Sequence, residues 1–158
     1  EGGRPDRLAL LEENALAAFK GGIGRRVRSF APAAALVGGE NHPAKSAAAI
    51  RARIDGGNEW LGVCVDTGWL GTQGVPAPQA VREIGALVRH THMKDVKAAG
   101  AHATCLLGEG VVDVAGTLAA LRQIGYAGWY SWEDEPEDRE PFASAVRNRR
   151  WIEEHLTM

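Results

Sequence analysis

Short apolar runs alternate along the chain with longer stretches in which apolar residues recur at helical spacing. Short runs are typical of buried strands, and the spaced pattern is typical of amphipathic helices. The apolar runs predict strands at residues 33–39, 61–65, 88–93 and 129–132. The spaced patterns predict helices at residues 7–30, 47–54, 76–87, 113–124 and 142–156.

The resulting order is one helix followed by four strand–helix units, which predicts an α/β fold with a parallel sheet. The strands are apolar on both faces, as expected for parallel strands. Residues 1–158 contain no linker or low-complexity tract, so we expect one domain. Within it, residues 1–32 supply the helix that precedes the first strand, and residues 96–110 form a loop.

Composition excludes several classes of partner. The chain is 45% hydrophobic and 24% charged, with a formal net charge of −2, which is typical of a globular domain. This balance argues against a nucleic-acid partner, and the short apolar runs argue against a membrane span. Cys64 and Cys105 are far apart and form no Cys-x-x-Cys pair. A reducing compartment is therefore expected, and with no basic, apolar leader in view we predict a cytoplasmic location.

Four metal-capable side chains come where the predicted strands end: Glu40, Asp66, His92 and Glu133. The carboxyl ends of parallel strands meet at one edge of a sheet, where α/β enzymes hold their active sites. Taken singly, each residue has a plainer explanation, such as a helix cap, a turn, a structural histidine or an exposed acidic loop. Together they predict one shared site. Carboxylates with one imidazole suit Mn²⁺, Mg²⁺, Co²⁺ or Zn²⁺.

Five segments carry a resemblance to a known family. They are Glu40-Asn-His-Pro43, Val63-Cys-Val-Asp-Thr-Gly68, His90-Thr-His-Met-Lys-Asp95, Leu107-Gly-Glu-Gly-Val-Val-Asp113 and Ile124-Gly-Tyr-Ala-Gly-Trp-Tyr-Ser-Trp-Glu133. In this order they resemble the xylose isomerase-like TIM-barrel superfamily, and within it the sugar phosphate isomerase/epimerase family. The resemblance implies a (β/α)8 TIM-barrel fold, of which this chain matches the C-terminal half, about four β/α units.

The resemblance also implies a reaction. Glu40, Asp66, His92 and Glu133 would coordinate one divalent metal, and Glu40 and Glu133 would be the catalytic acid/base pair on opposite faces of the substrate. One removes a proton next to a carbonyl and the other returns it, through a metal-stabilised enediolate. The predicted function is therefore a metal-dependent isomerase or epimerase of a small sugar or keto-sugar. Two alternatives stay open: a metal-dependent dehydratase or lyase on an inositol-like substrate, and a non-catalytic binding or assembly module.

Three further residues are candidates for substrate binding: His42, Trp69 and Lys94. Trp69 stands three residues after Asp66, where the family often has a histidine. Its presence counts against an endonuclease IV-like phosphodiesterase, and its ring could stack on a sugar face or cover the site. For Lys94, a solvated side chain is the plainer alternative.

Several neighbouring residues have structural interpretations. His90 is expected to be either a buried structural histidine or part of the pocket. Asp95 is expected to cap a helix or turn, and Asp113 to cap the helix that follows it. The aromatic side chains around Trp129 are expected to lie mostly in the core.

Half a barrel leaves two open sheet edges and an uncovered inner face. Two explanations are open. The chain, which begins with Glu1 rather than Met, is a fragment whose N-terminal half is missing, or two copies pair as a homodimer that closes an eight-stranded barrel.

Overall fold

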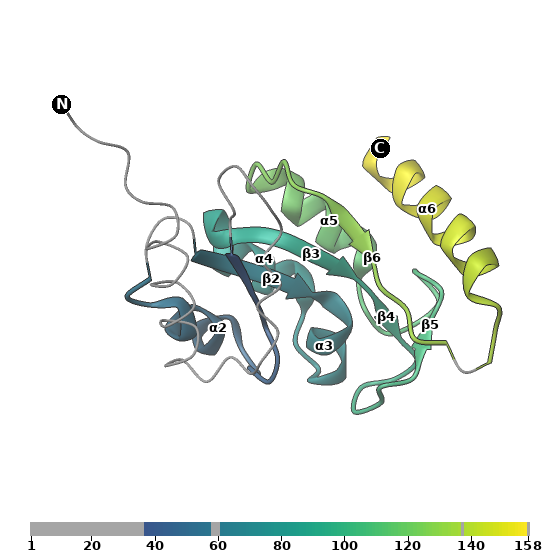
Figure 1. Cartoon of the computed structure of the whole chain (residues 1–158), viewed down its shortest axis with the longest axis horizontal. Helices are drawn as coiled ribbons and strands as arrows, with labels where there is room; N and C mark the ends of the chain where they lie inside the picture. Colours follow the sequence, from purple (N-terminus) through teal and green to yellow (C-terminus); the bar gives the residue numbers. More distant parts are fainter. Residues whose placement is uncertain (1–36, 58–60, 137, 158) are drawn as a thin grey trace.

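A four-stranded parallel sheet forms the centre of the described chain, with strand order β1-β2-β3-β6 (Figure 1). The computed structural model describes residues 37–57, 61–136 and 138–157. The predicted helix at residues 7–30 and the start of the first predicted strand lie outside these ranges. The strands are β1 (Val37–Glu40), β2 (Leu61–Asp66), β3 (Val88–Met93) and β6 (Tyr130–Trp132).

Helices follow the strands along the chain. They are α2 (Ala47–Ile54), α3 (Thr67–Thr72), α4 (Ala77–Ile84), the short 3-10 helix η1 (Gly85–Leu87), α5 (Val114–Gln123) and α6 (Pro141–Thr157). Ser46 and Asp113 cap α2 and α5, because each side chain accepts a hydrogen bond from a backbone N–H in the first turn. The predicted role of Asp113 is therefore confirmed. None of the helices in the described residues is both long and apolar enough to cross a membrane.

The core lies between the sheet and a helical layer in which α4 packs against both α2 and α5. Val63 and Val65 of β2 are completely buried in one cluster with Val81 of α4 and Leu118 of α5. Successive side chains of a strand point to opposite faces. The residues that alternate with these valines, Cys64 and Asp66, therefore face the other side of the sheet.

The sequence analysis located all four strands and the α/β class correctly, but it missed two elements. The first is α3, which begins directly after Asp66. The second is a short antiparallel pair, β4 (Asp95–Val96) with β5 (Thr104–Cys105), inside the predicted loop. These elements are too short to show a hydrophobic period, so their formation depends on contacts with the rest of the fold.

The prediction that the aromatic residues around Trp129 lie mostly in the core is confirmed for two of the three. Trp129 is 83% exposed, whereas Tyr130 and Trp132 pack against the core. The pairing of β6 with β3 begins at Tyr130, so Trp129 precedes the first paired residue and its ring stays outside the packed layers.

Candidate active site

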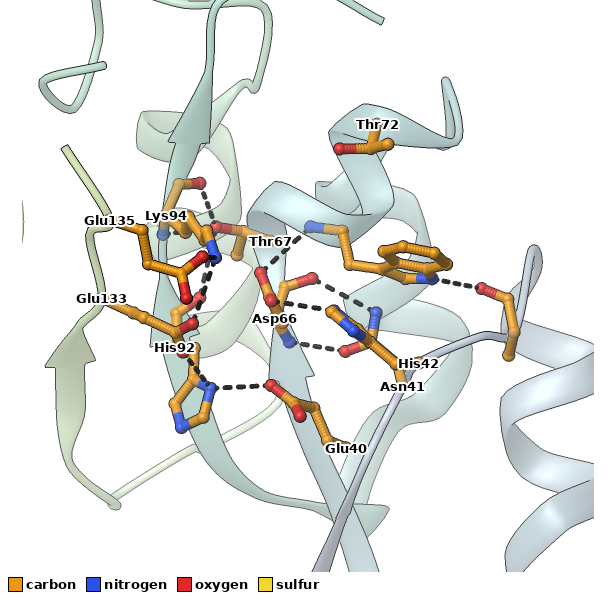
Figure 2. A network of polar contacts seen from close by, with 12 residues as sticks. Glu40, Asn41, His42, Asp66, Thr67, Thr72, His92, Lys94, Glu133 and Glu135 are labelled. Carbon is orange, nitrogen blue, oxygen red and sulfur yellow. Dashed lines mark hydrogen bonds and ion pairs between the residues drawn. The ribbon is translucent and has the colours of Figure 1, made fainter. Parts of the chain in front are cut away.

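The ends of the four strands bring the predicted site residues together (Figure 2). Glu40 and Asp66 are the last residues of β1 and β2, and His92 is the next-to-last residue of β3. Glu133 directly follows β6, and its backbone N–H donates to the Met93 carbonyl at 3.2 Å, which extends the strand pairing by one residue. One potential ligand atom from each of the four side chains lies within 4.8 Å of the others.

His92 joins the two outer strands of the described sheet. Its Nδ1 lies 3.0 Å from Oε1 of Glu40 on β1 and 2.6 Å from Oε2 of Glu133 beyond β6. All three side chains are about 70% buried, with exposed fractions of 27%, 28% and 31% for Glu40, His92 and Glu133. Two carboxylates, one from each outer strand of the described sheet, therefore converge on one ring nitrogen.

This convergence shifts the pKa values of all three groups. Hydrogen bonds with Cys64, Glu133 and Glu40 raise the pKa of His92 to about 12. The hydrogen bond from His92 lowers the pKa of Glu133 to about 2, against the opposing effect of burial. The same interaction lowers the pKa of Glu40. At neutral pH the chain thus places a positive charge between two ionised carboxylates.

Asp66 is completely buried and is held by Asn41, a residue that the sequence analysis did not single out. The Asn41 Oδ1 accepts the backbone N–H of Asp66 at 2.6 Å, and its Nδ2 donates to the Asp66 carbonyl at 3.2 Å. Oδ1 of Asp66 accepts the backbone N–H of Trp69 at 3.0 Å and caps α3. Its Oδ2 lies 3.0 Å from Nε2 of His42. Asp66 therefore acts as a helix cap and also belongs to the cluster.

Thr67 ties the ends of β2 and β3 together and was also missed. Its hydroxyl accepts the backbone N–H of Lys94 at 2.8 Å and donates to the Lys94 carbonyl at 2.6 Å. The next residue is Gly68, where an added Cβ would lie 2.6 Å from Cγ of Lys94. A glycine here is what lets the lysine side chain pass over the start of α3. The signals in the sequence were that both residues follow a predicted strand and end the segment Val63-Cys-Val-Asp-Thr-Gly68.

Lys94 is buried, with 8% of the residue exposed, so the interpretation as a solvated lysine was wrong. Its Nζ lies 3.1 Å from Oε1 of Glu133 and 3.2 Å from Oε2 of Glu135. Burial disfavours its charge, but the carboxylates of Asp66 and Glu133 outweigh this effect and raise its pKa. The ammonium group therefore stays charged beside the cluster.

Three aromatic rings form a shelf next to Asp66. The ring centroids of His42 and Trp69 are 4.1 Å apart at an interplanar angle of 36°, and those of Trp69 and His102 are 5.9 Å apart. The Trp69 Nε1 donates to the Ala44 carbonyl at 2.9 Å, which fixes the indole. We call His42, Trp69 and His102 the aromatic shelf. His102 was not predicted, because it lies in the stretch that was interpreted as a loop.

The donor set fits a divalent metal. Three carboxylates and one imidazole offer hard oxygen ligands and one nitrogen, a combination that Mn²⁺, Mg²⁺, Co²⁺ and Zn²⁺ all accept. Carboxylates within 4.8 Å of one another repel unless a cation lies between them. In the structure the His92 proton supplies part of this charge, and a metal ion would supply more. The roles of these residues as ligands remain predictions.

Comparison with known proteins identifies the family and similar structures. A sequence model of the family described as xylose isomerase-like TIM barrel matches residues 34–155. A xylose isomerase domain protein from Planctomyces limnophilus is 27% identical with a TM-score of 0.57, over 71% of this chain and 43% of that protein. No curated protein matches the sequence significantly.

An epimerase and an epimerase-like protein of known structure are similar in fold. An L-ribulose 3-epimerase has a TM-score of 0.60 at 22% identity, covering 72% of this chain and 42% of the epimerase. A D-tagatose 3-epimerase-like protein has a TM-score of 0.61 at 21% identity, covering 77% of this chain and 42% of that protein. The chain thus spans about two fifths of the length of these structures, as expected for part of a barrel.

Proposed function

The chain belongs to the family of xylose isomerase-like TIM barrels, and from this premise we propose that it carries the catalytic residues of a divalent-metal-dependent sugar isomerase or epimerase. The observation that carries the proposal is the convergence of Glu40 and Glu133 on His92, at 3.0 and 2.6 Å, from the two outer strands of the described sheet. Moving a proton between two faces of a substrate needs a proton-transfer group on each face, and carboxylates from the two outer strands could supply both.

Glu40, Asp66, His92 and Glu133 would hold the metal. When bound, the cation would polarise the carbonyl and hydroxyl oxygens of the sugar and so acidify the carbon between them. Glu40 and Glu133 would act on that carbon from opposite sides. One ionised carboxylate would remove the proton to give an enediolate, and the other, once it has taken up a proton from solvent, would protonate the opposite face. The low pKa values of both groups favour the ionised form that a base needs.

Ketoses are the substrate class that we propose. The similar solved structures include an L-ribulose 3-epimerase and a D-allulose 3-epimerase from Methylomonas sp., whose names specify inversion at the carbon next to a ketone. The aromatic shelf supports this class, because a ring such as Trp69 can cover the apolar face of a sugar. Lys94, held against Glu133 and Glu135, would donate hydrogen bonds to a substrate oxygen.

A closed barrel needs about eight strands, and the described sheet has four. We propose that the remaining wall comes either from further sequence of the same protein or from a second copy of this chain. The edges of β1 and β6, which pair with no further strand among the described residues, would make the new strand pairs in both arrangements. We also propose a cytoplasmic location, which the free thiols of Cys64 and Cys105 support.

The test measures metal content and proton exchange together. The protein is stripped of metal, reloaded with Mn²⁺, and incubated in D₂O with ketopentoses, ketohexoses and an inosose. We expect about one metal per chain, deuterium at the carbon next to the ketone, and formation of the C3 epimer. Glu109→Gln is the matched control for Glu133→Gln, since Glu109 is an exposed glutamate that pairs with Arg147 away from the site.

Other outcomes would replace the proposal. Loss of water from the inosose without epimerisation would indicate a dehydratase. Tight metal binding with no exchange in any substrate, in a preparation shown to have a closed barrel, would indicate a non-catalytic module. Sedimentation of the chain at rising concentration would separate a homodimer from a monomer.

A further inference from the structure

A second cluster of metal-capable side chains lies one layer deeper in the sheet than the carboxylate site. It consists of Cys64 on β2 and of His90 and His92 on β3. Cys64 is paired in register with His90, and two residues further on Asp66 is paired with His92. The cluster therefore shares His92 with the carboxylate site and extends from it toward the amino ends of the strands.

Strand alternation places all three side chains on one face. Val63 and Val65 flank Cys64 in sequence, Thr91 and Met93 flank His92, and all four flanking residues are completely buried on the side of the helices. Cys64 and the two histidines therefore point to the opposite face, which also carries the carboxylates. This placement follows from the backbone register and does not depend on side-chain rotamers.

The three donor groups are close enough to share one ion. One potential ligand atom from each lies within 4.8 Å of the other two. The rings of His90 and His92 meet edge to face with centroids 5.3 Å apart. Cys64 is 5% exposed, whereas both histidines are only partly buried, so the cluster is accessible from the histidine side.

The chemistry of this set differs from that of the carboxylate site. A thiolate and two imidazoles are softer ligands than carboxylates and select zinc-like cations over Mg²⁺ or Mn²⁺. Three protein ligands with one position left for water is the usual number in an accessible zinc site. We propose that Cys64, His90 and His92 form a second site, for a thiophilic divalent cation such as Zn²⁺ or Co²⁺, and that this site competes with the carboxylate site for His92.

Competition follows from the structure of imidazole. A neutral histidine ring has one lone pair available, because its other nitrogen carries a proton. His92 can therefore serve one cation at a time while it keeps that proton. An ion at the thiol site takes His92 away from Glu40, Asp66 and Glu133, and two protons are released to solvent: the thiol proton of Cys64 and one ring proton of the charged His92. The inference needs only the described residues and does not rest on the proposed sugar reaction.

Co²⁺ tests the site directly, because a cobalt–thiolate bond gives a charge-transfer band in the near ultraviolet. We expect the band when the whole metal-free chain is titrated with Co²⁺, and its loss in Cys64→Ser. His90→Gln should raise the apparent Co²⁺ dissociation constant at least about tenfold, since loss of even an outer-shell partner commonly costs 10–100-fold. Cys105→Ser is the matched control, because Cys105 is the other buried free cysteine but lies on β5.

The band in wild type and in Cys105→Ser, together with its loss in Cys64→Ser, would establish the thiol ligand. A folded wild type without the band would overturn the proposal, and so would a band that persists in Cys64→Ser. If Cys64→Ser does not fold, as judged by circular dichroism, a band unchanged in strength and affinity in folded His90→Gln would overturn the proposed ligand set.

Competition is measured by the electron paramagnetic resonance of Mn²⁺. Zn²⁺ equimolar with the chain should raise the apparent Mn²⁺ dissociation constant of the wild-type chain about tenfold or more. Because the carboxylate site also accepts Zn²⁺, the effect should persist in Cys64→Ser but be clearly smaller than in wild type. Equal sensitivity to Zn²⁺ in both proteins would show that Zn²⁺ simply enters the carboxylate site, and it would contradict the competition.

Discussion

Two buried aspartates, Asp66 and Asp95, occupy similar positions in the sequence but differ in the hydrogen bonds that their carboxylate oxygens accept. Both follow or end apolar strand segments, and they are 0% and 1% exposed. Asp95 accepts four backbone hydrogen bonds of 2.9–3.0 Å, two on each oxygen, from the N–H groups of Val96, Gly108, Gly110 and Val112. Its lone pairs are satisfied by the chain itself, so its role is structural.

Asp66 accepts one backbone hydrogen bond, from Trp69 to Oδ1, and its Oδ2 faces His42 and the carboxylate cluster. No backbone N–H of the described residues donates to Oδ2, so this oxygen is shared between His42 and any ligand of the cluster. The two aspartates differ in the number of backbone N–H groups that donate hydrogen bonds to the carboxylate. That number depends on loop geometry: at Gly110 an added Cβ would lie 2.3 Å from Oδ1 of Asp95.

The largest expected effect is on the rate of epimerisation, when Glu133 beside Asp66 is replaced. Glu133→Gln should lower epimerisation by about 10²–10⁴-fold, the usual contribution of a general acid or base. The amide keeps the shape of the side chain but cannot take a proton from carbon. Rates of deuterium incorporation in the active protein measure this effect. An unchanged rate would remove Glu133 from the reaction.

Asp66→Asn tests the functional half of the comparison. We expect the Mn²⁺ dissociation constant to rise about a hundredfold or more, because loss of an outer-shell partner alone commonly costs 10–100-fold. The amide oxygen can still accept the Trp69 N–H, so unfolding by urea should change little. Calorimetric titration measures the affinity. A large loss of stability with normal affinity would reverse the assignment.

Asp95→Asn tests the structural half. An amide nitrogen replaces one accepting oxygen, so two backbone N–H groups lose their acceptor, at about 1–3 kcal/mol each. We expect the free energy of unfolding in urea to fall by about 2–6 kcal/mol on this basis, with Mn²⁺ affinity nearly unchanged. Asp113→Ala is the control, since loss of this exposed cap should cost only about 1 kcal/mol.

The smallest effect expected is on pH dependence. His92 has a pKa of about 12 in the metal-free chain because of Cys64, Glu133 and Glu40, so an entering metal must displace its proton. The apparent affinity should rise about tenfold per pH unit from pH 7 to 9, with release of about one proton. An unshifted histidine would give a flat profile above about pH 7.5.

The same shift has a consequence for the metal-free chain. The pKa of His92 is raised above its unfolded value near 6.5, so this stabilisation is complete below pH 6.5 and is lost gradually as the pH rises toward 12. Thermal unfolding without metal should therefore occur at lower temperature at pH 9 than at pH 6.5. The His92→Gln variant should lack this part of the dependence.

Much of the fold and the outline of the site could be predicted from the sequence. The strand and helix periods are local, so the four strands and the Asp113 cap were recognisable along the chain. The positions of Glu40, Asp66, His92 and Glu133 at strand ends were equally visible, because parallel strands bring their carboxyl ends to one edge. The identity of the donor atoms follows from residue type alone.

The tertiary structure decided which groups meet and which oxygens stay available. Asn41 holds Asp66 across 25 residues of sequence, and Glu40 reaches His92 across 52. Lys94 is buried only because Gly68 leaves room beneath it and Glu133 and Glu135 lie opposite. Such contacts have no period along the chain. They arise when strands pair in one register, and hydrogen bonds between distant segments then assign each polar side chain to the scaffold or to the site.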